Sequence, residues 1–277
     1  MKTMLVTGGT DGIGKALVLR YLQKDYEIVA VGSSSEKGES LIEAAEKLGK
    51  KERITFIQAN LSLVSENRRI IEMIQQKWTK LDLLVLCAAN LKPQAAYKET
   101  GEGFEFTFAL YYLSRYILSY ELMGMLRASD SPKIINVAAP GMKGEVNWND
   151  IQFKEKYDGQ KVQFHGSRLN DLLGVCFNKK NTDNRIQYIL FNPMAARTNG
   201  AKKMASGIMG VFMSLYYKFV GKNPEEIAEI IESHIEKDTE DGIQAYVLKK
   251  SVDMKMNTFN VENAKKLDEI TRDILTK

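Results

Sequence analysis

Cysteine, histidine and proline are scarce in this sequence. Its 277 residues include only two Cys, two His and five Pro. Cys87 and Cys176 both lie inside apolar segments, which predicts neither a disulfide framework nor a CxxC metal site. His165 and His234 are too few to build a histidine metal centre. We therefore expect no metal in this protein.

Long hydrophobic runs and a strong charge imbalance are also absent. The nearest approach to a membrane span, Ile208–Val220, is shorter than the roughly 20 apolar residues that cross a bilayer. The net charge is only +4 and the basic residues are scattered, as on solvated surfaces rather than on a nucleic-acid-binding face. A strand pattern begins at Thr3, which leaves no room for a signal peptide. These absences predict a cytoplasmic protein without a membrane span or a nucleic-acid partner.

Short apolar, β-branched runs alternate with longer amphipathic stretches along most of the chain. This alternation predicts an α/β fold, with a doubly wound parallel sheet, helices on both faces and right-handed crossovers. Because no linker or internal repeat interrupts the pattern, we expect a single domain over residues 1–277. The expected strands are Thr3–Val6, Glu27–Val31, Ile54–Ala59, Leu81–Leu86, Lys133–Val137, Ile186–Phe191 and Ile243–Leu248.

The amphipathic stretches give the expected helices, the last of which falls in residues 260–277. Residues 194–222 break the alternation and suggest an insertion in the place of a substrate lid. Its Met-rich run, Met204–Met213, predicts either a packed helix or subunit contact, or an adaptable apolar cover over a pocket. The expected helices are Gly14–Leu22, Glu39–Leu48, Glu66–Trp78, Gly103–Leu126, Ser167–Phe177, Pro224–His234 and Val261–Leu275.

A glycine-rich turn joins the first expected strand to the first expected helix. Residues 7–14 read Thr-Gly-Gly-Thr-Asp-Gly-Ile-Gly. Glycines there allow a tight turn and the close approach of a pyrophosphate, and the amides at the helix N-terminus face that anion. In a strand–turn–helix context at the start of an alternating chain, the motif predicts dinucleotide binding.

The T-G-x-x-x-G-I-G spacing resembles that of the short-chain dehydrogenase/reductase family. Further segments resemble landmarks of this family in the same order along nearly the whole chain, and the C-terminal ones resemble its retinol-dehydrogenase-like branch. The resemblance implies a Rossmann-type sheet of about seven strands that binds NAD or NADP. These segments are 60–62 (Asn-Leu-Ser), 84–89 (Leu-Val-Leu-Cys-Ala-Ala), 134–139 (Ile-Ile-Asn-Val-Ala-Ala), 167–170 (Ser-Arg-Leu-Asn), 192–198 (Asn-Pro through Thr) and 224–226 (Pro-Glu-Glu).

The resemblance also implies which residues hold the cofactor. Three of them depart from the family pattern: Asn60 replaces an aspartate near the adenine, and Cys87 and Ala89 replace an asparagine and a glycine. The implied cofactor-binding residues are Gly8, Thr10, Asp11, Gly12, Ile13, Gly14, Ser33, Ser34, Asn60, Leu61, Cys87, Ala88, Ala89, Arg168, Pro193 and Thr198.

The choice between NAD and NADP rests on the end of the second strand. No acidic residue there reads a ribose 2′-hydroxyl, and the hydroxyls of Ser33 and Ser34 with Lys37 tolerate a 2′-phosphate. Asp11, however, stands where many NADP-using relatives carry a basic residue. We favour NADP and keep NAD as the alternative.

The four catalytic positions of the family hold unsuitable residues. In the family, a tyrosine protonates the substrate carbonyl, a lysine lowers the pKa of that phenol, a serine polarises the carbonyl and an asparagine holds a relay water. The resemblance aligns these positions with Phe164, Arg168, Ala139 and Tyr111. Phenylalanine has no proton to donate and alanine has no hydroxyl, whereas arginine stays charged but can hold a ribose hydroxyl. Losing a general acid costs roughly 10²- to 10⁴-fold in rate, so the sequence argues against ordinary carbonyl reduction.

Several residues offer substitutes for the missing acid. Tyr157 and Lys161 have the spacing Y-x-x-x-K, but the Asp-Gly between them predicts a turn rather than a helix interior. Tyr111 is either a substitute acid or an aromatic ring filling the space beside Ala139, and we favour the second. His165 is either an acid titrating near neutrality or a surface residue on the first turn of a helix, and again we favour the second.

Three functions stay open at this point. The first, which we favour, is a nucleotide-binding pseudoenzyme that acts as a sensor or accessory protein of a pathway, with an unknown small-molecule or protein partner. The second is an NADP(H)-dependent oxidoreductase or a non-redox enzyme in which Tyr111 or His165 is the acid. The third is an interaction protein without a ligand, which Cys87 and Ala89 in the cofactor wall slightly favour. Because relatives often pair through their fourth and fifth helices, a homodimer is expected.

Overall fold

The computed structural model describes residues 1–90, 92–142, 144–194, 222–237, 239 and 242–276 of the chain. The described part forms one sheet of eight strands. The strands are β1 (Lys2–Thr7), β2 (Tyr26–Gly32), β3 (Ile54–Gln58), β4 (Leu83–Leu86), β5 (Lys133–Val137), β6 (Gln187–Asn192), β7 (Ile243–Val247) and β8 (Lys250–Ser251).

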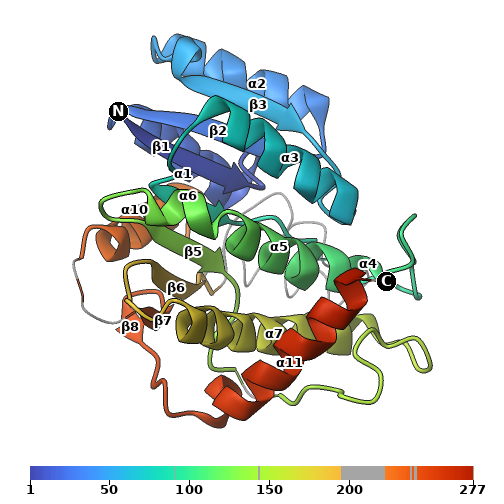
Figure 1. Cartoon of the computed structure of the whole chain (residues 1–277). Coiled ribbons are helices and arrows are strands. Elements are labelled where there is room, and N and C mark those ends of the chain that lie inside the picture. The colour runs from blue at the N-terminus through green and yellow to red at the C-terminus, as the bar shows by residue number, and fades with distance from the viewer. Residues whose placement is uncertain (91, 143, 195–221, 238, 240–241, 277) are drawn as a thin grey trace.

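The strand order is β3-β2-β1-β4-β5-β6-β7-β8 (Figure 1). All neighbours from β3 to β7 pair in parallel, and β8 pairs antiparallel with β7. The predicted single-domain, doubly wound parallel sheet of about seven strands is confirmed, and the further strand is a two-residue edge. The chain order reverses between β1 and β4, where Thr7 is paired with Leu86. In such sheets ligands bind outside the carboxyl ends of the strands at this reversal.

Helices cover both faces of the sheet. Alternate residues of β1 show the two layers, because Met4 and Val6 pack with one helical layer and Leu5 packs with the other. The main helices are α1 (Gly12–Leu22), α2 (Ser35–Lys47), α3 (Val64–Lys77), α4 (Phe106–Phe108), α5 (Ser114–Glu121), α6 (Met123–Arg127), α7 (Gly159–Lys180), α10 (Pro224–Ile235) and α11 (Val261–Thr276).

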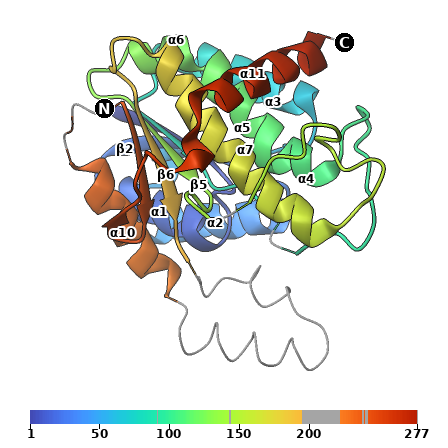
Figure 2. The same cartoon turned by 90° about the horizontal axis from the view of Figure 1, so that it is seen from below.

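α1, α2 and α10 cover one face, and α3, α5 and α7 cover the other. Figures 1 and 2 show α11 running across α7 on the outside of the second layer. None of the described helices combines the length and the apolar character that crossing a bilayer requires.

The single helix predicted for Gly103–Leu126 is wrong. The chain there makes the short α4, then a π-helical stretch at Ala109–Leu113, then α5, and breaks again at Leu122 before α6. A π-helical stretch adds a residue to a turn and shifts the side chains that follow it around the helix axis. The amphipathic pattern alone does not show such an insertion, because the residues before and after the insertion are both apolar.

The helix predicted for Ser167–Phe177 begins earlier, at Gly159. The Asp158 carboxylate accepts hydrogen bonds from the amides of Gln160 (3.0 Å) and Lys161 (3.1 Å) and so caps the N-terminus of α7. The Asp-Gly pair that suggested a turn is therefore a helix start. Of the predicted lid, 194–222, residues 195–221 with the run Met204–Met213 lie outside the described residues.

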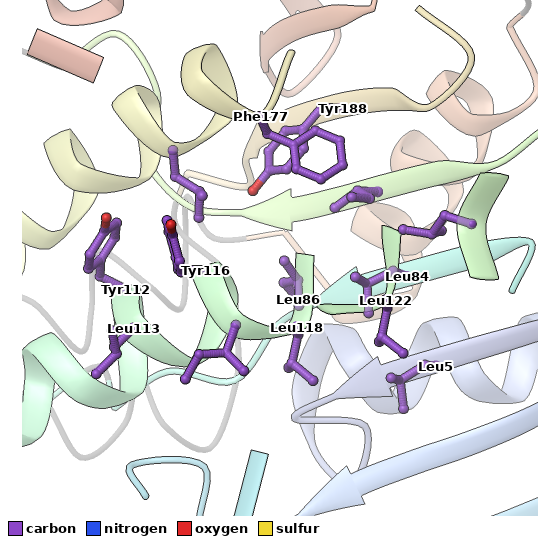
Figure 3. Packing of buried hydrophobic residues seen from close by; sticks show 14 of the residues in the cluster. Leu5, Leu84, Leu86, Tyr112, Leu113, Tyr116, Leu118, Leu122, Phe177 and Tyr188 are labelled. Atoms are coloured by element: carbon purple, nitrogen blue, oxygen red, sulfur yellow. The ribbon is translucent and has the colours of Figure 1, made fainter. Parts of the chain in front are cut away.

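α11 docks on the second layer through two buried tyrosines. The hydroxyls of Tyr112 and Tyr116 point the same way from neighbouring turns (Figure 3). Tyr112 shares a 2.6 Å hydrogen bond with Thr271, and Tyr116 donates to Asp268 at 2.9 Å. Asp268 is 3% exposed and is also paired with Lys180 and Arg272, each at 2.7 Å. Burial alone raises the pKa of the Asp268 carboxyl, but the hydrogen bonds of Lys180 and Tyr116 outweigh it and hold the pKa below its usual value.

Asp268→Asn is expected to lower the free energy of unfolding by about 1–3 kcal/mol at pH 7, because three partners lose a charged acceptor. The lowered pKa of Asp268 gives stability above the unfolded pKa of about 3.9, and that stability is lost as the pH falls below it. The difference between wild type and variant should thus stay constant down to about pH 5 and shrink as the pH falls toward 3 and below. Urea unfolding at several pH values measures it.

Asp130→Asn is the matched control, because Asp130 is 96% exposed and lies 3.7 Å from Lys80. It should change the unfolding free energy by less than about 0.5 kcal/mol. Equal effects of the two substitutions would show that the Asp268 cluster does not fasten α11.

Candidate functional site

The predicted phosphate turn has the backbone that its glycines suggest. Gly8 and Gly12 have φ angles of +66° and +52°, in the region that only glycine adopts without cost. A Cβ on Gly8 would lie 2.9 Å from the amide nitrogen of Ala88, and a Cβ on Gly14 would overlap the carbonyl oxygen of Gly8. The turn therefore packs backbone to backbone against itself and against the end of β4.

Asp11 caps the helix that follows this turn. Its carboxylate accepts a 2.8 Å hydrogen bond from the amide of Gly12 and forms a close ion pair with Lys37. Ser34 in turn caps α2, because its hydroxyl accepts a 3.3 Å hydrogen bond from the amide of Lys37. Asp11, Ser34 and Lys37 thus lie together beside the end of β2. In doubly wound sheets the ribose 2′ position, which carries a phosphate in NADP and a hydroxyl in NAD, lies at this end.

The remaining residues implied as cofactor-binding follow the carboxyl ends of the same sheet. Asn60 is exposed, and its side-chain oxygen accepts hydrogen bonds from the amide (3.2 Å) and the hydroxyl (2.8 Å) of Ser62. Thr198 lies outside the described residues. The others are Thr10 beside Gly32, Ile13 in α1, Ser33 after β2, Leu61 after β3, Cys87, Ala88 and Ala89 after β4, and Pro193 after β6. The fold therefore brings residues that are far apart in sequence to one edge.

The residues at the tyrosine and lysine positions share a face of α7 but differ in burial. Phe164 is 53% exposed, whereas Arg168 is only 2% exposed. Arg168 Nη2 donates to the carbonyl of Ala139 at 2.6 Å and pairs with Asp171 at 3.0 Å. The Nε and Nη1 atoms of Arg168 are buried and have no hydrogen-bond partner in the part of the chain that the structure describes. Burial raises the pKa of Asp171 to about 7 against the opposing effect of Arg168 and of hydrogen bonds from Thr258 and Gly141.

Tyr111 lies in the π-helical stretch and is wedged between two elements. Its hydroxyl is 3.3 Å from the Ser167 hydroxyl, and its ring lies 4.4 Å from the guanidinium of Arg115. A Cβ on Gly166 would lie 2.6 Å from the ring, so α7 approaches the ring closely. The ring therefore packs against Gly166 and Arg115, its hydroxyl faces a polar neighbour, and the filling of space beside Ala139 stays a prediction.

His165 is not the surface residue that the sequence suggested. It is 5% exposed and its ring packs edge-on against Phe153, with 5.1 Å between ring centroids. Burial lowers the pKa of His165 to about 4, so the ring is neutral near pH 7. The prediction failed because α7 begins at Gly159, which places His165 inside the helix rather than on its first turn.

The Y-x-x-x-K pair does not form a site. Tyr157 precedes α7, and its hydroxyl donates to Glu105 at 3.0 Å. Lys161 is 70% exposed and pairs with Asp158. The two side chains therefore interact with different partners and not with each other.

Sequence reasoning missed Arg115, which lies directly beneath this edge. It is 1% exposed and donates to the carbonyls of Val137 (2.8 Å) and Ala88 (3.1 Å) and to the side-chain oxygen of Asn136. The signal was available, because Arg115 is the one charged residue between Thr107 and Tyr120 in an otherwise apolar helical stretch.

Comparison with known proteins agrees with this geometry. Residues 2–149 match the short chain dehydrogenase family. The chain belongs to that family. Similar proteins include an oxidoreductase of Emericella nidulans (27% identity over 61% of this chain and 51% of the relative), human polyprenol dehydrogenase (25%, 56% and 48%) and mouse retinol dehydrogenase 13 (23%, 82% and 69%). The chain spans about half the length of the first two relatives.

Solved structures share the fold of this family member. A Pseudomonas aeruginosa RhlG/NADP active-site complex superimposes with a TM-score of 0.67 at 18% identity, covering 89% of this chain and 94% of the other. A 3-ketoacyl-(acyl-carrier-protein) reductase from Brucella melitensis complexed with NADH gives a TM-score of 0.66 at 17% identity, covering 89% and 96%. At such identities the likeness establishes the fold alone.

Gly14→Ala is expected to destabilise the protein by about 1–3 kcal/mol, because the new methyl overlaps the Gly8 carbonyl. Gly124→Ala is the matched control. Gly124 lies in α6 with nothing within 4 Å of its Cβ position, so alanine should stabilise by about 0.5–1 kcal/mol. Thermal unfolding of the two variants measures the difference, and a neutral Gly14→Ala would contradict the close packing of the turn.

Proposed function

We propose that this protein binds a nicotinamide dinucleotide and lacks ordinary carbonyl or alcohol oxidoreductase activity. One contrast carries the proposal. The phosphate turn keeps its glycine backbone, while Phe164 and Ala139 offer neither a proton nor a hydroxyl at the edge of the sheet. Such a protein acts as a sensor or as an accessory protein of a pathway.

The residues present fit a dinucleotide. The glycine turn of residues 8–14 leads directly into α1, and the amides after Gly12, whose own amide is capped by Asp11, would bind a pyrophosphate. The exposed amide nitrogen of Asn60 would face the adenine. The unpartnered Nε and Nη1 atoms of Arg168 are donors that ribose hydroxyls would satisfy.

The side chains of Phe164, Ala139 and Arg168 limit the chemistry that can follow cofactor binding. A bound nicotinamide supplies hydride chemistry, but a carbonyl substrate also needs a proton and a polarising donor. Removing the acid costs roughly 10²- to 10⁴-fold, and removing one polarising donor costs about 10²- to 10³-fold. Arg168 keeps its proton and is held by Asp171, so it does not replace the family's lysine as a relay.

Between the two cofactors we favour NADP. Residues 33–35, directly after β2, include no carboxylate, and the Ser33 and Ser34 hydroxyls with Lys37 would accept a 2′-phosphate. The ion pair of Lys37 with Asp11 opposes the binding of NADP, because a 2′-phosphate must compete with the Asp11 carboxylate for the Lys37 ammonium. The similar structures hold NADP in one case and NADH in the other.

A second function rests on Tyr111. Its phenol is the one acid at the four family positions, and it lies within 3.3 Å of the Ser167 hydroxyl. An oxidoreductase of altered chemistry, acting on an alcohol or carbonyl like the dehydrogenases it resembles, would use this phenol. His165 is a weaker choice because burial keeps its ring neutral.

NADPH and NADH are expected to raise the melting temperature, NADPH more strongly. At about 100 times Kd the stabilisation should reach roughly 2.7 kcal/mol. Differential scanning fluorimetry with both nucleotides, and with GTP as an unrelated anionic control, measures it. Absence of any shift with either dinucleotide would reject cofactor binding.

Restoring the family residues in A139S/F164Y/R168K is expected to raise NADPH-dependent reduction of a simple aldehyde by at least about 10²-fold over wild type. Nucleotide absorbance at saturating aldehyde measures the rate. Y111F tests the second function, with Y112F as its control, because Tyr112 bonds Thr271 away from the edge. If wild type already reduces the aldehyde and Y111F alone abolishes turnover, the pseudoenzyme proposal is wrong and the Tyr111 mechanism is right.

A further inference from the structure

Arg115 carries a charge for which the described structure shows no counter-charge. Its guanidinium is fully buried and contacts only neutral groups: two carbonyls, the Asn136 side chain and the Tyr111 ring. No carboxylate of the described residues forms an ion pair with it, and Asp171 is committed to Arg168. The segment 195–221 contains neither Asp nor Glu in its sequence.

A buried charge without a counter-ion is costly, and the neutral acceptors offset only part of that cost. Burial lowers the pKa of Arg115, yet a guanidinium keeps its proton near neutral pH. Among the described residues its Nε atom also lacks a hydrogen-bond partner. This edge of the sheet therefore holds a positive charge that no described carboxylate neutralises.

Arg115 lies under one particular half of the proposed cofactor site. In doubly wound sheets the pyrophosphate sits at the first turn and the adenosine half lies toward the end of β2. The nicotinamide half then extends the other way, over the ends of β4 and β5. The Arg115 guanidinium binds the carbonyls of Ala88, just after β4, and Val137, the last residue of β5.

We propose that Arg115 makes this protein bind the reduced dinucleotide in preference to the oxidised one. The oxidised nicotinamide ring is a cation, and the reduced ring is neutral. The uncompensated guanidinium beneath the nicotinamide half repels the oxidised ring and leaves the reduced ring unaffected. This inference rests on the proposed function. With this preference, a dinucleotide-binding protein without turnover becomes a sensor of nucleotide redox state.

The size of the effect follows from Coulomb repulsion. For unit charges about 8–10 Å apart in a medium of effective dielectric constant about 20, the preference is on the order of tenfold. Above the Asp171 pKa of about 7, for example at pH 8, the Asp171 carboxylate at 3.0 Å accompanies the charge of Arg168, so Arg168 adds little there. Arg115 is thus a selectivity residue that acts through space.

The test is isothermal titration calorimetry of the full chain with NADPH, NADP⁺ and ADP-ribose. Wild type should bind NADPH about tenfold more tightly than NADP⁺. R115Q should bring the two dissociation constants within about threefold of each other and leave ADP-ribose binding unchanged, because ADP-ribose has no nicotinamide ring. R115K keeps the charge and should keep most of the preference. Circular dichroism establishes that each variant is folded.

The outcomes separate the two proposals. If none of the three ligands binds, the proposed function fails and takes this inference with it. If wild type binds NADPH and NADP⁺ equally, only this inference fails, and that result needs no variant to fold. A preference that persists in R115Q, or a loss in R115Q that affects ADP-ribose equally, assigns the selectivity elsewhere and overturns the role of Arg115.

Discussion

The close backbone approach between the phosphate turn and the end of β4 is the constraint on which this site depends. A methyl group on Gly8 would lie 2.9 Å from the Ala88 amide, so β1 and β4 meet at the reversal of the sheet with no side chain between them. This contact sets the position of the helix amides in α1. It also fixes the Ala88 carbonyl, which accepts a hydrogen bond from the Arg115 guanidinium. One packing requirement therefore positions both the anion-binding groups and the buried cation.

The sequence predicted the layers and the order of the elements well, because these depend on the period of apolar residues and on glycine turns. Lys133–Val137 has the predicted bounds, and the ends of the other predicted strands lie within two residues of the observed ones. The failures lie where a side chain controls the backbone locally. Asp158 caps α7 in a position where Asp-Gly usually marks a turn, and the π-helical stretch at Ala109–Leu113 has no distinct apolar period. His165 was misplaced for the same reason, since its burial depends on where α7 begins.

The candidate site shows a similar division. The positions of the glycines and of the residues at the strand ends were predictable, because the fold places them at one edge of the sheet regardless of their side-chain contacts. The partners of Arg168 were not predictable. Its lysine-like position suggested a ribose contact, but one Nη atom is already bound by Asp171 and Ala139. Asp171 lies one helical turn away on the same face of α7, so the pair follows from i,i+3 geometry once the helix is known. Two donor atoms remain without a described partner, and on this ground we propose that the arginine binds a ribose rather than relays a proton.

The proposed absence of turnover is compatible with the buried charge of Arg115 at this edge of the sheet. An active reductase must release the oxidised nucleotide and accept the reduced one, so strong selectivity between them slows or biases its cycle. In the protein that we propose, in which Phe164 and Ala139 supply neither a proton nor a polarising hydroxyl, no turnover would constrain the charge beneath the nicotinamide half. A permanent cation such as Arg115 would then cost nothing in rate and would discriminate between two ligands that differ by one charge. On this proposal, the edge of the sheet would report which form of the nucleotide is bound.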